Sequence, residues 1–243
     1  MTEILQTELP YDPLTPRPLP GISAMSIEDW LHHDEAFAGQ MARRDQLLAD
    51  TYDDVVAMDD EAREAAQELL DLVLSRAYPE CDSYVVRADG VRIEVDYDNP
   101  LLTLGRLVQE DFCILQKQGD EHVLTGAVLC FPASWTLSEK FMRPLIGIHD
   151  GVESYDSGIA RRVQRLFDGV QVSKPMWRFN ALWYRDAELH QPRSFLKRRV
   201  APEQKAADYL RSERQCILRL PQSSAVIFSI HTYVLARRDV PGA

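Results

Sequence analysis

The sequence predicts an α+β fold, in which an antiparallel sheet carries helices on one of its faces. Two pairs of strand-like runs are neighbours in the chain, and the turns Asp89-Gly90 and Gly119-Asp120 separate the members of each pair. One helical pattern over 158–169 then precedes three further strand-like runs, so strands and helices do not alternate regularly. No strand-like run leads into a GxGxxG or GxxxxGK loop, which disfavours nucleotide binding by those devices.

Length and composition limit the class further. The chain has 243 residues, of which 45% are apolar and 27% are charged, as is typical of a globular protein. Its net charge of −11 disfavours nucleic acid or an anionic membrane as the main partner, because both attract basic surfaces. No run approaches the roughly 18 apolar residues of a membrane span, and the first residues lack a signal-peptide pattern. We therefore expect a cytoplasmic protein that binds neither nucleic acid nor membrane.

The cysteines argue against a disulfide framework or a zinc site. They are scattered along the chain and show no CxxC or CxH spacing. Most of them lie in apolar runs, which is typical of small buried side chains. The four are Cys81, Cys113, Cys130 and Cys216.

The N-terminal part begins with an extended segment and continues with two predicted helices. Five prolines within residues 9–21 exclude a helix there. Ser26 is a candidate N-cap with Asp29 three residues later, which predicts the start of the first helix. The second helix is predicted over about 59–76, where apolar residues recur at steps of four, three and four.

The remainder of the chain is predicted to be rich in strands. Short apolar or alternating runs bounded by turn residues indicate strands. Residues 133–155 lack such a pattern and are expected to be irregular. The predicted strands are 84–86, 92–96, 112–115, 122–131, 176–184, 215–220 and 225–234.

We expect one folded domain with an appendage at each end. Residues 1–25 are predicted to form an extended arm, and residues 237–243 a short tail. Residues 26–236 would form the single domain, whose first part, 26–79, is an N-terminal helical cap. The chain contains no internal repeat and no low-complexity segment.

His149 is the histidine whose position is most suggestive of chemistry. It follows the apolar run 145–148 and stands near Gly151, a setting that suits an axial ligand of haem iron. The alternative is a histidine that closes a loop through hydrogen bonds. His32 is expected to face solvent on a charged helix, and His231 to face outward from an alternating strand.

Two arginines in predicted strands also permit two interpretations. Arg178 lies between Trp177 and Phe179, and Arg214 lies at the entry to a later strand. Each arginine either forms a structural ion pair or binds a ligand carboxylate with two parallel hydrogen bonds, as haem propionates require.

Several sequence blocks resemble the family of haem-dependent oxidative N-demethylases over about residues 20–235. The third block, which begins at Leu210-Arg211-Ser212-Glu213-Arg214-Gln215, is the most specific. The blocks are 109–112 leading to 131–135, Glu139-Lys140 and Ile148-His149, then Trp177-Arg178-Phe179-Asn180, then 210–215 with 218–230 and Thr232-Tyr233, preceded by Trp30, Asp34 and Arg44.

The resemblance implies a PAS-like antiparallel sheet that binds haem b. Relatives act as catalytic subunits that use dioxygen to remove a methyl group from a small amine as formaldehyde. They receive electrons from NADPH through separate flavin and iron–sulfur components. By this resemblance His149 would be the proximal iron ligand, and Arg178 and Arg214 would anchor the propionates. Glu213 would act in the catalytic site by orienting Arg214 or by meeting a cationic substrate.

The chain departs from the family pattern near the expected haem edge. Asp150-Gly151-Val152-Glu153 stands where a Pro-Val-Pro run is usual, and Phe141 stands where a glycine is usual. Ala181 replaces a tryptophan, with Trp183 two positions later. These differences leave open two alternatives to an enzyme: a non-catalytic PAS sensor of haem-bound gas or a small ligand, and a structural subunit without haem.

Overall fold

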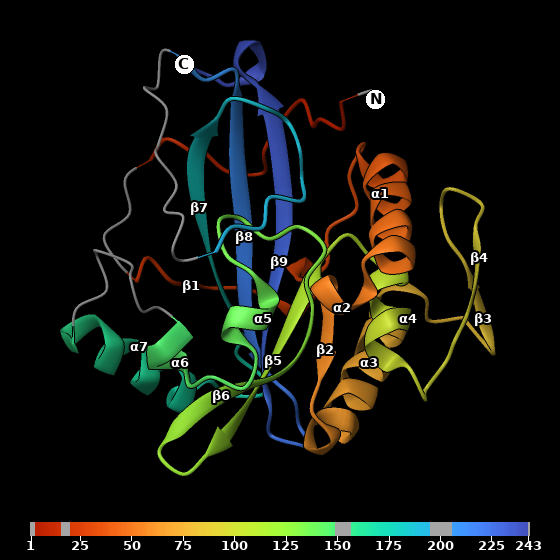
Figure 1. Ribbon diagram of the computed structural model, residues 1–243, viewed down its shortest axis with the longest axis vertical. Coiled ribbons are helices and arrows are strands. Elements are labelled where there is room, and N and C mark those ends of the chain that lie inside the picture. Colours follow the sequence, from red (N-terminus) through yellow and green to blue (C-terminus); the bar gives the residue numbers. More distant parts are fainter. Residues whose placement is uncertain (1–2, 16–19, 149–156, 195–205, 243) are drawn as a thin grey trace.

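The computed structural model describes residues 3–15, 20–148, 157–194 and 206–242. In this part of the chain, seven strands form one antiparallel sheet in the order β1-β7-β8-β9-β5-β6-β2 (Figure 1). The strands are β1 Ser23–Ala24, β2 Val56–Met58, β5 Asp111–Gln118, β6 Glu121–Val128, β7 Met176–Tyr184, β8 Tyr209–Arg219 and β9 Val226–Ala236. The mixed α/β class with an antiparallel sheet is therefore confirmed.

The helices lie on both faces of this sheet. Phe112 and Ile227 of the sheet belong to one apolar cluster with Leu69 of α3. Cys113, which points the other way in the same strand as Phe112, belongs to a second cluster with Phe167 of α7. The helices are α1 Phe37–Asp50, α2 Tyr52–Val55, α3 Arg63–Ala77, α4 Pro100–Leu107, α5 Leu137–Lys140, α6 Leu145–Ile148 and α7 Ser157–Gly169, with 3₁₀ turns at Ile27–Asp29, Asp60–Ala62 and Arg237–Asp239.

This arrangement differs from the expectation that the helices share one face. The central strands are buried on both faces, as the nearly unbroken burial of β6 and β9 shows. A sheet that is apolar on both sides must be covered on both sides. Helices α1, α3 and α4 cover the first face, and α5 to α7 lie against the second (Figure 1).

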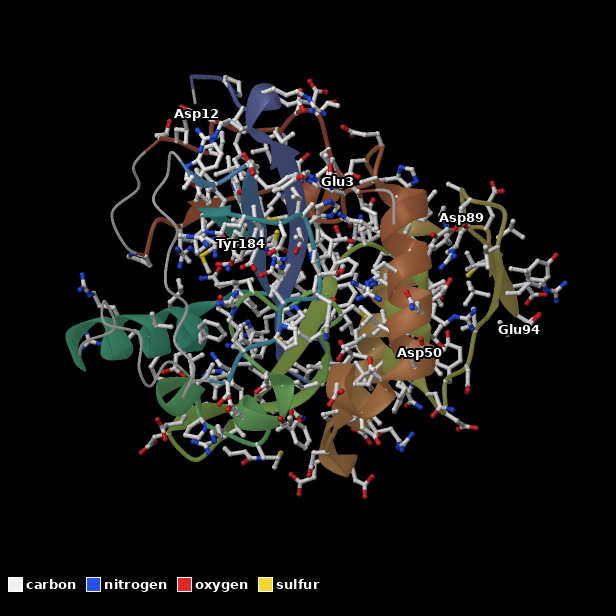
Figure 2. The ribbon with its side chains drawn as sticks, turned by 45° about the horizontal axis from the view of Figure 1, so that its top comes forward. Glu3, Asp12, Asp50, Asp89, Glu94 and Tyr184 are labelled. Atoms are coloured by element: carbon white, nitrogen blue, oxygen red, sulfur yellow. The ribbon has the colours of Figure 1, made fainter. Side chains whose placement is uncertain are left out.

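A short hairpin stands outside the main sheet. β3 (Tyr84–Val86) and β4 (Arg92–Glu94) pair with each other, as the sequence predicts. Gly90 has a φ of 83° at the turn, a conformation that glycine adopts without strain. The hairpin lies beside the helices on the side away from the sheet, and its Asp89 and Glu94 lie at the edge of the molecule (Figure 2).

Local signals explain where the helices begin. The side chain of Asp59 accepts a hydrogen bond from the backbone of Glu61 at 3.0 Å and caps the turn that leads into α3. The corresponding signal at Ser26 yields a 3₁₀ turn without a side-chain cap. Helix α4, which was not predicted, begins at Pro100, because proline is tolerated in the first turn of a helix.

A fully buried ion pair joins α1 to the start of β5. Arg44 Nη1 lies 2.7 Å from Asp111 Oδ1, and Arg44 Nε donates to the carbonyl of Gly105 at 2.8 Å. Asp111 also accepts the backbone N–H groups of Cys130 and Phe131, each at 2.8 Å. Both charges are therefore well supplied with partners, which is what a buried pair requires. Arg44 and the block around Asp111 thus have structural roles.

A second buried network surrounds His231, which does not face outward as expected. Its two ring nitrogens lie 2.9 Å from Glu110 Oε1 and 2.9 Å from Asp34 Oδ2. His32 is also partly buried; its backbone N–H donates to Glu110 at 2.8 Å, and its Nδ1 lies 2.6 Å from the hydroxyl of Tyr233. These contacts fix the turn before α1 against β9.

The N-terminal segment lies across the ends of the long strands. Gln6 pairs with Val234 through its backbone N–H, and its side-chain oxygen accepts the Val234 N–H at 2.8 Å. Tyr11 stacks on Phe179 with 4.4 Å between ring centroids, and its hydroxyl lies 3.0 Å from that of Ser212. The segment therefore contacts β9, β8 and β7 in turn. No helix among the described residues is long and apolar enough to cross a membrane.

Candidate functional site

A cavity of about 350 Å³ lies on the face of the sheet opposite α1, α3 and α4. Strands β5 to β9 and helices α5, α6 and α7 contribute to its lining, and Pro20, Ile22 and Trp135 add to it from loops. Its volume lies within the range of small-molecule sites. Most of the lining is apolar: Pro20, Ile22, Cys113, Leu115, Leu124, Trp135, Leu145, Ile148, Val163, Leu166, Phe167, Ile217, Phe228 and Ile230.

Four polar side chains form one patch on the β7–β8 part of the cavity. Arg178 is paired in register with Gln215, and Asn180 with Glu213. Residues two apart in a strand face the same side of a sheet, so these two pairs are neighbours. All four line the cavity.

Glu213 is held within this patch by two amides. Asn180 Nδ2 donates to Glu213 Oε2 at 3.1 Å, and Gln215 Nε2 donates to the same oxygen at 3.0 Å. Asn180 Oδ1 in turn accepts the backbone N–H of Glu213 at 3.2 Å, which orients the amide. Glu213 Oε1 lies 3.6 Å from Arg211 Nη2. The carboxylate is thus fixed, and Oε1 retains lone pairs for a further donor.

Arg178 is the cation of the patch. Its Nε is buried and has no hydrogen-bond partner among the described residues. Burial lowers the pKa of the Arg178 guanidinium, and the Glu213 carboxylate offsets part of this effect. A buried donor without an acceptor is costly in a native protein. Arg178 is therefore suited to bind an acceptor that a ligand brings into the cavity.

Arg214 lies on the opposite face of the sheet, because adjacent strand residues point in opposite directions. Its Nη1 donates to the carbonyl of Trp30 at 3.0 Å, and its Nη2 to the carbonyl of Asp29 at 2.6 Å. The guanidinium also lies 5.3 Å from the centroid of the Trp177 ring. Arg214 is 4% exposed and does not line the cavity. The structure therefore brings Arg178 and Glu213 together and places Arg214 elsewhere.

Lys140, at the end of α5, also faces the cavity. Its Nζ lies 4.8 Å from the centroid of the Trp135 ring, a cation–π distance. Burial lowers the pKa of Lys140 to about 8, and interactions with Cys113 and Glu139 act in the opposite direction.

His149 lies outside the described residues. Ile148, which precedes it and ends α6, lines the cavity. Among the described residues there is no group of three or more histidine, cysteine, aspartate or glutamate side chains that could hold a metal ion.

Sequence reasoning assigned no role to Asn180, Gln215 or Lys140. The first two could have been found from their spacing, because Asn180 is two residues after Arg178 and Gln215 is two after Glu213. In neighbouring strands this spacing places all four side chains on one face. Lys140 carries no such signal, because its approach to the cavity depends on how α5 packs.

Comparison with known families agrees with this architecture. Residues 21–241 match the family model described as "haem-dependent oxidative N-demethylase, alpha subunit-like". The match covers the sheet, the helices on both faces and all of the described cavity residues except Pro20. The chain belongs to the haem-dependent oxidative N-demethylase alpha-subunit-like family.

Proposed function

We propose that this chain is a haem-binding catalytic subunit that oxidatively demethylates a small amine, and that the cavity is its haem site. The observation that carries the proposal is Arg178, a half-buried arginine in a largely apolar cavity, whose buried Nε has no hydrogen-bond partner among the described residues. An apolar cavity with a cationic donor fits a flat, apolar cofactor that carries carboxylates. The family match supports the same cofactor. Residues 26–236 would form one PAS-like haem-binding domain.

Two residues are proposed to hold haem b. His149 would ligate the iron, since it follows Ile148 of the cavity lining. Arg178 would bind a propionate through its guanidinium. The role predicted for Arg214 stays a prediction, and the placement of its side chain on the other face favours Arg178 as the anchor.

Haem b, when bound, would supply the activation of dioxygen that oxidative demethylation requires. In the overall reaction an N-methyl amine, dioxygen, two electrons and two protons yield the demethylated amine, formaldehyde and water. The apolar lining would exclude bulk water from this reaction. Glu213 would attract the substrate as an ammonium ion, with Oε1 as the acceptor, while Asn180 and Gln215 hold its other oxygen.

The two electrons would come from a separate NADPH-dependent reductase with flavin and iron–sulfur centres. The sequence has no dinucleotide fingerprint and no iron–sulfur cysteine spacing, so an external donor is required. We also propose a cytoplasmic location for this chain, on the basis of its amino-acid composition.

Formaldehyde release tests the proposed reaction. Haem-loaded protein, a reductant, dioxygen and a panel of secondary and tertiary methylamines should yield formaldehyde, and protein without haem should yield none. Because the residues after His149 depart from the family pattern, dimethylamine is expected to be a poorer substrate than another amine of the panel. Stable binding of dioxygen without formaldehyde from any amine would favour a sensor instead.

A further inference from the structure

Lys140 is the cavity-lining side chain that the proposed function leaves without a role. It lies at the C-terminal end of α5, and its ammonium group faces the cavity beside Trp135. It forms no salt bridge with a described residue. The charge of Glu139, its neighbour in the helix, raises the pKa of Lys140 by less than burial lowers it. Lys140 is thus a cation beside an aromatic face in a largely apolar space.

Such a placement has an energetic cost that a ligand can relieve. Burial disfavours the charged ammonium, and the lowered pKa of Lys140, about 8, reflects this. At neutral pH most of the population is still charged. An acceptor of opposite charge would form a charge-assisted hydrogen bond with it, which is among the stronger kinds.

Glu213 does not supply this acceptor, because no hydrogen bond or salt bridge joins it to Lys140 in the described part of the chain. Its described partners are Asn180, Gln215 and Arg211. Lys140 reaches the cavity from the end of α5, whereas Arg178 and Glu213 reach it from the paired strands β7 and β8.

We propose that Lys140 is a second carboxylate-binding residue of the cavity. The chemistry is that of an ammonium that donates to a carboxylate of the bound ligand. Two sources can supply it: the second propionate of haem, or a carboxylate on the substrate, as in an N-methyl amino acid. The identity of these ligands rests on the proposed function, whereas the carboxylate chemistry rests on Lys140 and its surroundings alone.

Three variants test the role of the charge. Lys140→Met keeps the aliphatic stem and removes the ammonium, and Lys140→Arg keeps a cation. Lys174→Met is the matched control, because Lys174 is exposed and outside the cavity lining. Thermal unfolding of each variant establishes that the fold is retained before binding is compared.

Two titrations distinguish the sources of the carboxylate. In the first, haem and haem dimethyl ester are titrated into the protein and the Soret absorption is followed. In the second, N-methylglycine and N-methylethylamine, which differ by a carboxylate, are titrated calorimetrically into protein with and without haem.

The wild type and Lys174→Met should favour the carboxylate-bearing member of at least one pair, and Lys140→Met should bind that member about 10- to 100-fold more weakly. Lys140→Arg should restore most of the affinity. A change confined to the haem pair identifies the propionate, and a change confined to the amine pair identifies a substrate carboxylate.

Equal affinity of wild type and Lys140→Met for haem and for N-methylglycine would overturn the inference. Its failure is distinct from that of the proposed function. If the wild type binds no haem, yet loses N-methylglycine binding in Lys140→Met, the haem proposal fails and the carboxylate site stands. If haem binds normally to every variant and no carboxylate preference exists, the carboxylate site fails and the haem proposal stands.

Discussion

Glu213 and Arg214 are adjacent in β8, and their side chains lie on opposite faces of the sheet. Glu213 faces the cavity and accepts hydrogen bonds from Asn180 and Gln215. Arg214 donates to the backbone carbonyls that precede α1. The two residues therefore belong to different parts of the molecule: one contributes to the cavity, and the other holds the N-terminal helical layer against the sheet.

Replacing each of the two arginines by leucine should separate these roles. Arg178→Leu removes the cation of the β7–β8 patch, so haem affinity should fall about 10- to 100-fold while the free energy of unfolding changes little. Arg214→Leu leaves two buried carbonyl oxygens without their donor and should destabilise the fold by about 3 kcal/mol, with haem affinity retained. Haem titration and denaturant unfolding of both variants measure the two effects. An Arg214→Leu protein that is stable but binds haem weakly would restore Arg214 as the propionate anchor.

Glu213→Gln should weaken the binding of a cationic amine. The substitution removes the negative charge and keeps an oxygen that can accept from Asn180 and Gln215. We expect about a tenfold weaker substrate affinity, with haem binding close to that of the wild type. Amine titration of the haem-loaded variant, followed through the Soret band, gives the affinity. Glu94→Gln, at an exposed position of the hairpin, is the control. Unchanged amine affinity in Glu213→Gln would exclude Glu213 from substrate recognition.

The buried network around His231 should make stability depend on pH. Burial by itself would lower the pKa of His231, but the carboxylates of Glu110 and Asp34 outweigh it and raise the pKa to about 9. The folded-state pKa is thus above the unfolded value of about 6.5. The contribution to stability is fully present below that value and is lost as the pH rises towards 9.

Asp34 should act in the opposite sense at acidic pH. Burial would raise its pKa, but the hydrogen bond and the charge of His231 lower it to about 2. Its contribution is present above the unfolded value of about 3.9 and is lost as the pH falls towards 2. Unfolding of wild type and His231→Gln between pH 3 and pH 10 tests both limbs. The difference in stability, roughly 3 kcal/mol at pH 6, should shrink as the pH rises from about 6.5 towards 9; a difference that stays constant would contradict this assignment.

Breaking the buried Arg44–Asp111 pair should be among the most destabilising single changes. Arg44→Met leaves a buried carboxylate without its cation and should lower the free energy of unfolding by about 3–5 kcal/mol. Arg92→Met removes the exposed pair with Glu94 and should change it by less than about 1 kcal/mol. Urea unfolding of the two variants gives the comparison. Similar, small effects in both would show that the buried pair contributes little.

Strand periodicity and turn residues were sufficient to predict most of the sheet, because its strands are apolar and bounded by glycine or proline. β8 begins at Tyr209, six residues before the predicted start at 215, because charged residues such as Arg211 and Glu213 obscure its pattern. These charges are buried and lie 3.6 Å apart, and Arg211 also donates to the carbonyls of Leu189 and Phe131 in distant loops. Such compensation is invisible in a sequence.

The candidate site was predictable to a similar extent. Arg178 and Glu213 face the cavity, as a ligand-binding role requires. Arg214 follows Glu213 directly in β8, so the alternation of side chains along a strand places it on the other face, which the prediction did not take into account. His231 was expected to face outward because an ionisable side chain in an alternating strand usually does. The opposing carboxylates, Asp34 and Glu110, are distant in sequence and meet it through the packing of β9 against the turn before α1.

The central claim is that the cavity binds haem, and titration of the purified protein with haem tests it most directly. The wild-type protein should give a saturable Soret band with one haem per chain. His149→Ala should abolish or grossly shift this band while the protein remains folded, since the iron would lose its axial ligand. A wild-type protein that gives no saturable Soret band, or a His149→Ala variant whose haem content and spectrum equal those of the wild type, would contradict the account.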